Sequence, residues 1–384
     1  MGTLRFMTAG ESHGPRLTAI LEGIPAGLKL CGEEINKDLA RRQQGYGRGG
    51  RMKIETDRAD ILSGVRFGET LGGPVTLSVT NKDWTNWTDR MAAFGEPAGE
   101  KVTAARPGHA DYVGIQKYDR QDIRDILERS SARETAMRVA VGGVCKAFLK
   151  ACGIEVVSHV VEIGGIKVNE DKINRDEIGK GSSELNCYDV EAEEKMKERI
   201  REAKEAGDTL GGVFEVIVRG VPIGLGSHIQ WDRRLDAALA GAMMSIQAIK
   251  GVEIGAGFKY AELPGSKAHD EMFYDENNRV YRKTNHAGGL EGGMTNGEEI
   301  TVRAVMKPIP TLMTPLHSID IESKEAVLAC KERSDVCAVS AASVVGEAMA
   351  AFVIARALVE KFGGDAMTDI LSALSAYKAR LAGE

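Results

Sequence analysis

The 384-residue sequence predicts an α+β fold in which buried helices lie between two antiparallel sheets. Two segments, 233–250 and 338–361, have helical periodicity with small or apolar residues on several sides, which is typical of helices covered on more than one face. Strand-like segments outnumber what one covering layer needs, and they alternate like half-solvated antiparallel strands. Chains of this length tend to divide, so we expect either two lobes or one unusually large layered domain over residues 1–384.

Composition narrows the class of protein. The chain is 43% hydrophobic and 28% charged, which is ordinary for a soluble globular protein with a large core. Its net charge of −6 disfavours binding to nucleic acid or to a membrane surface, so clusters of arginine are interpreted as pockets for small anions. We expect no metal site and a cytoplasmic location. The six cysteines form no C-x-x-C pair and are predicted to be free, buried thiols.

The N-terminal segments 4–8 and 17–22 are predicted strands, joined by a glycine-flanked turn. Within this turn, Gly10-Glu11-Ser12-His13-Gly14 matches the G-x-S-x-G pattern of a hydrolase nucleophile elbow. That elbow requires a strand before it and a helix after it, whereas here Pro15 and a second strand follow. The elbow is therefore rejected, and His13 is either a structural histidine or part of a turn that approaches a ligand.

A loop rich in glycine and arginine follows a predicted helix over 33–43. The guanidinium fork suits carboxylate and phosphate, so the segment 41–58 is expected to be mobile and to bind anions. A solvated basic loop is the alternative. The glycine pattern neither follows a strand nor opens a helix, so it is not a dinucleotide-binding fingerprint. Strands are predicted over 61–67 and 75–80, and Trp84 and Trp87 lie in a polar loop, where they serve packing, an interface or a lid.

The central helix is predicted to begin near Ser131 and Glu134, which have the spacing of a capping box. Arg129 and Arg133 flank this helix start, where free N–H groups favour an anion. An ordinary capped helix with surface arginines is the competing interpretation. An apolar stripe marks the buried face of the helix: Met137, Val141, Val144, Cys145, Phe148, Leu149 and Cys152.

The rest of the chain supplies further elements. Strands are predicted over 154–163 and 213–219, and a charged helix with a solvated face over 190–206. The segment 269–297 is long, polar and rich in glycine, and such segments are functional or disordered. We expect it to be mobile without ligand.

Three stretches resemble the signatures of the chorismate synthase family: GESHGPRLTAILEGIP near the start, ERSSARETAMRVAVGG in the middle, and RSDVCAVSAASVVGEAM from Arg333 to Met349. RPGHADYVG, GVEIG and NHAGGLEGG are similar to further blocks of that family, in matching order. The resemblance implies a lyase that converts 5-enolpyruvylshikimate 3-phosphate to chorismate, the last step of the shikimate pathway. It also implies a requirement for reduced FMN without net redox change, a β-α-β sandwich and a homotetramer.

The resemblance also assigns residues to ligands. The arginines that would bind substrate are Arg42, Arg48, Arg51, Arg106, Arg133 and Arg333, and family members that reduce their own flavin place NADPH near the positions of Arg42 and Arg48. Flavin contacts would come from Arg129, Ser130, Ser131, Gln247, Ala248, Gly292, Lys307, Pro308, Ile309, Pro310, Thr311 and Arg333. Many relatives have Asn where this chain has Gln247.

Three residues take catalytic roles by resemblance. His13 would supply a proton or a strong hydrogen bond to the departing phosphate, a task that suits an imidazole. His109 would act on the flavin. Asp335, with a neighbouring serine, would assist proton removal at flavin N5. Two other classes remain open: a flavin reductase, which would consume NADPH without the phosphorylated substrate, and a non-enzymatic anion-binding protein, which would not need both histidines. We expect an external flavin reductase as partner.

Overall fold

The N-terminal part of the chain forms an antiparallel sheet in a computed structural model that describes residues 4–49, 56–277, 279–330 and 335–383. Strand β2 alternates, with Leu17, Ala19 and Leu21 buried on one face, so this sheet has one core side. In spatial order the strands are β1 (Arg5–Ala9), β2 (Arg16–Glu22), β6 (Val75–Thr80) and β3 (Ala59–Ser63).

A second antiparallel sheet comes from the middle of the chain. Its central strands are nearly continuous apolar runs, and β15 pairs with β9 over its full length. The strand order is β10 (Ile249–Ile254), β15 (Ile300–Met306), β9 (Gly212–Arg219), β7 (Glu155–Ile163) and β8 (Ile166–Lys167).

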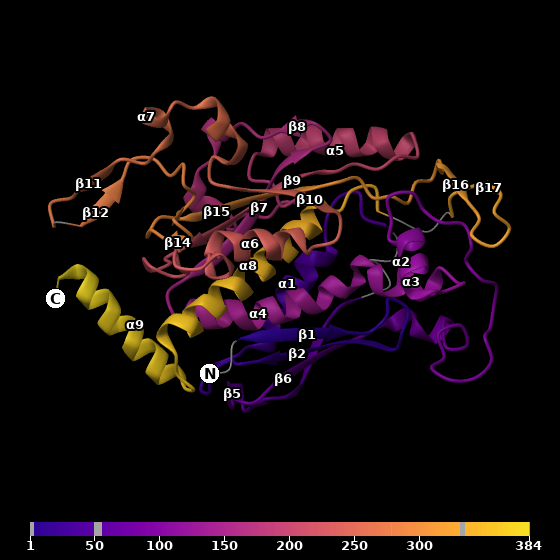
Figure 1. The fold of residues 1–384 in the computed structure, drawn as a ribbon, viewed down its shortest axis with the longest axis horizontal. Coiled ribbons are helices and arrows are strands. Elements are labelled where there is room, and N and C mark those ends of the chain that lie inside the picture. Colours follow the sequence, from indigo (N-terminus) through magenta and orange to yellow (C-terminus); the bar gives the residue numbers. More distant parts are fainter. Residues whose placement is uncertain (1–3, 50–55, 278, 331–334, 384) are drawn as a thin grey trace.

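Long helices lie between the two sheets in the view of Figure 1. Helix α4 (Thr135–Ala151) contacts β2 and β6, and helix α8 (Val339–Phe362) contacts β7 and β9. The two helices pack on each other, and α1 (Gly32–Gln43) packs on both. The predicted α+β class is confirmed, and every residue of the predicted apolar stripe in α4 and Cys152 beyond it is buried.

Helix α8 is long and apolar enough to cross a membrane by length and composition. However, 89% of its most apolar 18-residue stretch is buried inside the protein, so its composition is that of a core helix.

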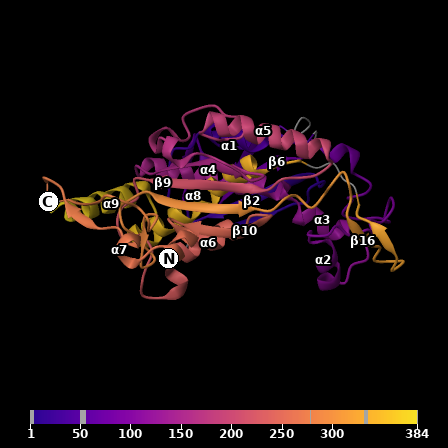
Figure 2. The same ribbon diagram turned by 90° about the horizontal axis from the view of Figure 1, so that it is seen from above.

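Further helices and hairpins lie at the two ends of the molecule. Helix α9 lies at one end, whereas α2, α3 and the β16–β17 hairpin lie at the other, as two perpendicular views agree (Figures 1 and 2). The remaining α-helices are α2 (Asp111–Tyr118), α3 (Arg124–Ser130), α5 (Val190–Glu205), α6 (Leu235–Met244), α7 (Gly265–Ala268) and α9 (Met367–Ala382). Short hairpins pair β4 (Val65–Arg66) with β5 (Glu69–Thr70), β11 (Met272–Tyr274) with β12 (Val280–Arg282), β13 (Leu290–Glu291) with β14 (Met294–Thr295), and β16 (His317–Ile319) with β17 (Ala326–Leu328). Short 3₁₀ helices occur at Lys82–Asn86, Ala132–Glu134, Glu170–Lys172, Arg175–Glu177, Trp231–Arg233 and Gly257–Glu262.

Helix α6 is shorter than predicted. The sequence predicts a helix to residue 250, but α6 ends at Met244, and Ala248 adopts a φ of 67° before β10 begins. A continuing helix is incompatible with that left-handed residue. The prediction that the helix is covered on several sides is also wrong within this chain, because Leu235, Leu239 and Met243 are buried while Met244 is exposed.

Three other predictions can be compared with the structure. The predicted single strand 61–67 is interrupted at Gly64, which turns the chain after β3 ends at Ser63. Val65–Arg66 forms the separate short strand β4, and Phe67 adopts a φ of 52° in the turn that follows. The segment 269–297, predicted as a long polar segment that is functional or disordered, contains the β11–β12 and β13–β14 hairpins, and its mobility without ligand stays a prediction. Of the six cysteines, four are buried, whereas Cys31 is exposed and Cys330 is partly exposed.

Candidate functional site

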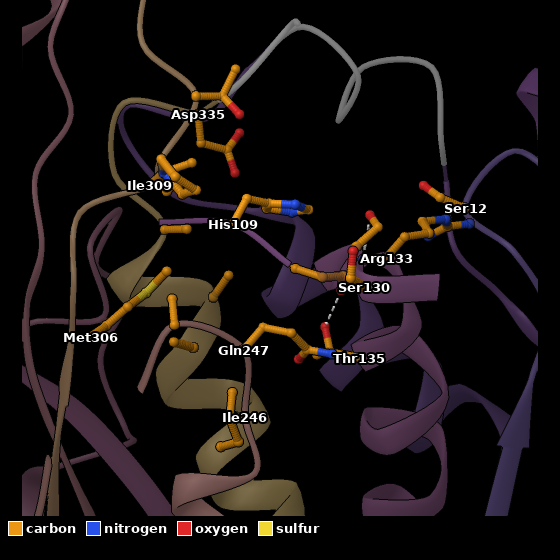
Figure 3. Close-up of a pocket in the computed structure, with 18 of the residues that line it drawn as sticks. Ser12, His109, Ser130, Arg133, Thr135, Ile246, Gln247, Met306, Ile309 and Asp335 are labelled. Atoms are coloured by element: carbon orange, nitrogen blue, oxygen red, sulfur yellow. Dashed lines mark hydrogen bonds between the residues drawn. The ribbon is translucent and has the colours of Figure 1, made fainter. Parts of the chain in front are cut away.

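A cavity of about 520 Å³ is lined in part by residues just before α2 and within α3. These two helices lie at one end of the molecule (Figure 1). Residues from distant parts of the chain surround the cavity, and Figure 3 shows Asp335, His109 and Gln247 facing the same space. The size falls within the roughly 300–1,000 Å³ of typical small-molecule sites. The cavity therefore collects in one place segments that the sequence spreads over more than 300 residues.

Most of the predicted site residues line this cavity. They are His13, Arg42, Arg48, Arg106, His109, Ser130, Ser131, Arg133, Gln247, Ala248, Lys307, Ile309, Pro310, Thr311 and Asp335. Pro308 interrupts the lining between two residues that belong to it. Arg51 and Arg333 lie outside the described residues.

Besides Pro308, two predicted flavin residues do not line the cavity within this chain. The Arg129 guanidinium is directed to the β1–β2 turn instead, where it donates hydrogen bonds to the carbonyl oxygens of Thr8 at 2.8 Å and Gly10 at 3.1 Å. Gly292 lies in the β13–β14 turn, near the side chain of His228. Neither residue lines this cavity, and their assignment as flavin contacts stays a prediction.

The turn that carries His13 requires glycine at its start. Gly10 has a φ of 109°, and a Cβ atom there would lie 2.4 Å from the carbonyl oxygen of Arg16. The turn is also closed by Asn81, whose side-chain amide donates a hydrogen bond to the carbonyl oxygen of Gly14 at 2.7 Å. This geometry places Ser12 and His13 at the mouth of the cavity.

His13 is held by a carboxylate that the sequence interpretation missed. Its Nδ1 lies 2.9 and 3.0 Å from the two carboxylate oxygens of Glu128, and its backbone N–H donates to the same carboxylate at 2.8 Å. Arg124 also donates to Glu128, at 2.8 Å. Burial raises the pKa of Glu128, but its hydrogen bonds and charge interactions with His13, together with the charge of Arg124, outweigh burial and lower that pKa.

Trp87 completes the surroundings of His13. Its ring stacks on the imidazole with centroids 4.1 Å apart and 33° between planes, and the Arg124 guanidinium lies 4.8 Å from its centroid. Trp87 therefore packs against a candidate catalytic residue, which agrees with the packing interpretation of the tryptophan loop.

His109 belongs to a different cluster, just before α2. Its Nδ1 lies 2.5 Å from Oδ1 of Asp111, and it also lies 3.1 Å from the Arg106 guanidinium. Arg106 donates to both oxygens of Asp111, at 2.8 and 3.0 Å. Burial raises the pKa of Asp111, but the hydrogen bonds and charges of His109 and Arg106 prevail and hold it far below its usual value.

Two cavity arginines share one buried carboxylate. Asp57 accepts from Arg133 at 2.7 and 2.6 Å and lies 3.4 Å from Arg42 Nη1, with its side chain inaccessible to solvent. Arg42 further donates to Thr135 Oγ1 and to the carbonyl oxygen of Ala132, both at 2.9 Å. Burial lowers the pKa of Arg42 to about 10, so it still carries its charge at neutral pH. Both guanidinium groups are thus fixed in the cavity wall.

Asp335 and Arg48 also meet in the lining of the cavity. Arg48 Nη1 lies 3.2 Å from one Asp335 oxygen, and the Gly49 N–H donates to the other at 2.5 Å. Asp335 therefore joins the start of the third signature to the arginine-rich loop.

Only one of the two hydrogen bonds of the predicted capping box forms. Ser131 accepts a hydrogen bond from the Arg133 N–H at 3.3 Å, but it caps a 3₁₀ turn, and α4 begins at Thr135. Glu134 does not return to the Ser131 N–H, which instead donates to the carbonyl oxygen of Leu127. The Glu134 carboxylate accepts from Thr8 at 2.8 Å and from Gln247 at 3.1 Å, because the fold brings β1 and the α6–β10 turn beside it.

The cavity fits the flavin that the resemblance implies. Ile246, Met306, Ala341, Ala342 and Val345 give it an apolar wall suited to a flat ring, while arginines and serine hydroxyls offer donors for phosphate. Gln247 donates to Glu134, and its Oε1 is buried without a hydrogen-bond partner among the described residues. A buried acceptor beside the cavity suits an N–H-bearing ligand.

A sequence model of the family described as chorismate synthase matches residues 4–359. This chain belongs to the chorismate synthase family. It is 60% identical over 378 residues to the chorismate synthase of Geobacter sulfurreducens, covering 96% of each chain, and 57% identical over 384 residues to that of Desulforamulus reducens, covering 98% of each. A structure titled "Crystal Structure of Chorismate Synthase" is similar over 100% of both chains, with a TM-score of 0.79 and 46% identity.

Glu128, Asp111 and Asp57 are the residues that the sequence analysis missed. The first two lie inside family blocks, Glu128 next to Arg129 and Asp111 two residues after His109, so the blocks themselves carried a signal. Asp57 follows the arginine-rich loop with no pattern that marks it.

Proposed function

We propose that this chain converts 5-enolpyruvylshikimate 3-phosphate to chorismate and phosphate by 1,4-elimination, as a carbon–oxygen lyase in the last step of the shikimate pathway. One observation carries the proposal: a single cavity gathers His13, His109, Asp335 and four arginines in a chain that belongs to the chorismate synthase family.

The arginines bind the anionic groups of the substrate. The substrate carries one phosphate and two carboxylates, and Arg42, Arg48, Arg106 and Arg133 all line the cavity. Their carboxylate partners hold the guanidinium planes in place before binding, which reduces the entropy that ordering them would cost.

His13 supplies the proton for the departing phosphate. Its Nδ1 is engaged by Glu128, which leaves Nε2 as the nitrogen available to a ligand. A proton on Nε2 passes to the bridging oxygen as the C–O bond breaks, so phosphate leaves with less negative charge.

Reduced FMN, when bound, supplies transient electron density that eases loss of phosphate. Ser130, Ser131, Gln247, Ala248, Lys307 and Thr311 would hold it, and the apolar wall would exclude water from its ring. His109 and Asp335 face the same space as groups that can hold or release a proton.

The decisive assay is anaerobic turnover with photoreduced FMN and no NADPH. We expect chorismate to form with reduced FMN and no chorismate with oxidised FMN under non-reducing conditions. Turnover with oxidised FMN would contradict the proposal. NADPH consumption in the absence of the phosphorylated substrate would favour a flavin reductase instead.

Finer features of the family are proposed on the same basis. We infer a single domain with a β-α-β sandwich, supported by the contacts of α4 with one sheet and α8 with the other. We further propose a cytoplasmic homotetramer served by an external flavin reductase, so that NADPH alone gives no useful turnover. The loops 41–58 and 269–297 should gain protection from hydrogen exchange when FMN and substrate bind.

A further inference from the structure

We propose that Glu128 is a positioning residue that fixes the tautomer and the orientation of His13. This inference rests on the proposed role of His13 as the proton donor. Glu128 lines no part of the cavity, so it would act through the histidine rather than on a ligand.

Three hydrogen-bond distances carry the argument. Both carboxylate oxygens lie within 3.0 Å of His13 Nδ1, and one of them also accepts the His13 backbone N–H at 2.8 Å. A carboxylate can accept hydrogen bonds but cannot donate them, so Nδ1 must carry a hydrogen in this geometry. The neutral ring is therefore held as the Nδ1–H tautomer, with the lone pair on Nε2.

The carboxylate itself is fixed from behind. The Glu128 side chain is 2% exposed, and Arg124, one helical turn earlier in α3, donates to it at 2.8 Å. One face of the His13 imidazole packs against the Trp87 ring. The ring is thus held along its Nδ1 edge and against one plane, and these contacts leave Nε2 as the reactive nitrogen.

The proposed proton transfer leaves His13 in the tautomer that Glu128 stabilises. Before the step both ring nitrogens carry hydrogen. The Nε2 proton moves to the phosphate oxygen, and the bonding electrons of the C–O bond leave with that oxygen. The neutral ring that remains is the Nδ1–H tautomer, which Glu128 already accepts from, so no ring flip is needed.

The test compares three variants of the full-length protein. Glu128→Gln keeps the shape but offers one oxygen where the native site uses two, and Glu128→Asp keeps the charge. Asp125→Asn is the matched control, because Asp125 is an exposed carboxylate on the same helix whose partner is Arg120. We expect Glu128→Gln to slow single turnover by roughly 10- to 100-fold with a nearly unchanged KM, Glu128→Asp to recover part of the rate, and Asp125→Asn to match the native protein.

A double-mutant comparison separates positioning from a structural role. In the His13→Ala background, adding Glu128→Gln should change the rate less than twofold, because the group it positions is gone. Equal losses in both backgrounds, or a Glu128→Gln variant as fast as the native protein, would overturn the inference.

A second readout does not depend on turnover. Solid-state ¹⁵N spectra of histidine-labelled protein at alkaline pH, assigned by difference with His13→Ala, report which ring nitrogen carries the hydrogen. We expect the Nδ1–H form in the native protein and a mixture in Glu128→Gln. Identical spectra would refute the inference even in an active enzyme. A Glu128-dependent tautomer in a protein that makes no chorismate would refute the proposed function and leave the positioning intact.

Discussion

His13 and His109 are both backed by buried carboxylates, but the two carboxylates are tied into the fold differently. Glu128 lies 115 residues from His13 on another element and also accepts the His13 backbone N–H. Asp111 lies two residues from His109, and its carboxylate also accepts hydrogen bonds from Arg106, an arginine that lines the cavity. Replacing His13 should therefore affect only the function of His13 itself. Replacing His109 should also disturb Arg106, which is proposed to bind an anionic group of the substrate.

The largest expected effect belongs to His13→Ala. Loss of the proton donor should slow single turnover by on the order of 10² to 10⁴-fold, while FMN and substrate still bind. Rapid-mixing measurements under anaerobic conditions provide the rate, and thermal unfolding provides the control for stability. Near-native single turnover in well-folded protein would remove His13 from the chemistry, and the two histidines would then not differ as proposed.

His109→Ala should slow turnover less than His13→Ala does, but it should change more properties of the protein. We expect roughly a 10²-fold loss, at the lower end for an acid–base group, together with weaker substrate binding because Arg106 loses a neighbour at 3.1 Å. The flavin absorption change on substrate binding should be altered as well. A pure rate defect with native substrate affinity would show that the His109 cluster is as self-contained as that of His13.

The smallest effect concerns acid stability. The pKa values of Asp111 and Glu128 are lowered on folding from 3.8 and 4.5, so the unfolded chain takes up each proton first as pH falls. Each carboxylate's contribution is complete above its unfolded value and is lost as pH falls through its folded value. Asp111→Asn should flatten the dependence of unfolding free energy on pH below about 3.8, and Glu128→Gln should flatten it from about 4.5 downward. Parallel curves for native and variant proteins in urea titrations would contradict this.

Local features were predictable from sequence. The glycine-flanked turn at His13, the apolar stripe of α4 and the buried length of α8 depend on periodicity and backbone conformation within a few residues. Most of the residues that the family resemblance assigned to ligands line one cavity, although they come from separate segments of the chain.

The missed features depend on tertiary contacts. Glu134 matched a capping pattern, yet the fold directs its carboxylate to Thr8 and Gln247, 126 and 113 residues away. Asp57 meets Arg133 across 76 residues. Nothing within either local window indicates such partners. The misjudged end of α6 is a local error, because Ile246 continues the helical phase of the apolar residues although the helix has already ended at Met244.

The pairing of arginines with carboxylates has a consequence for ionic strength. Among the described residues, four cavity arginines and Lys307 are offset by Asp57, Asp111 and Asp335, so few positive charges remain uncompensated. A substrate with one phosphate and two carboxylates would then be held by oriented, mostly desolvated N–H donors more than by a long-range field. Screening acts mainly on exposed charges separated by more than the Debye length, about 8 Å at physiological salt. The affinity of the cavity for its substrate should consequently weaken little as salt is raised, unlike the affinity of a shallow basic surface for an anion.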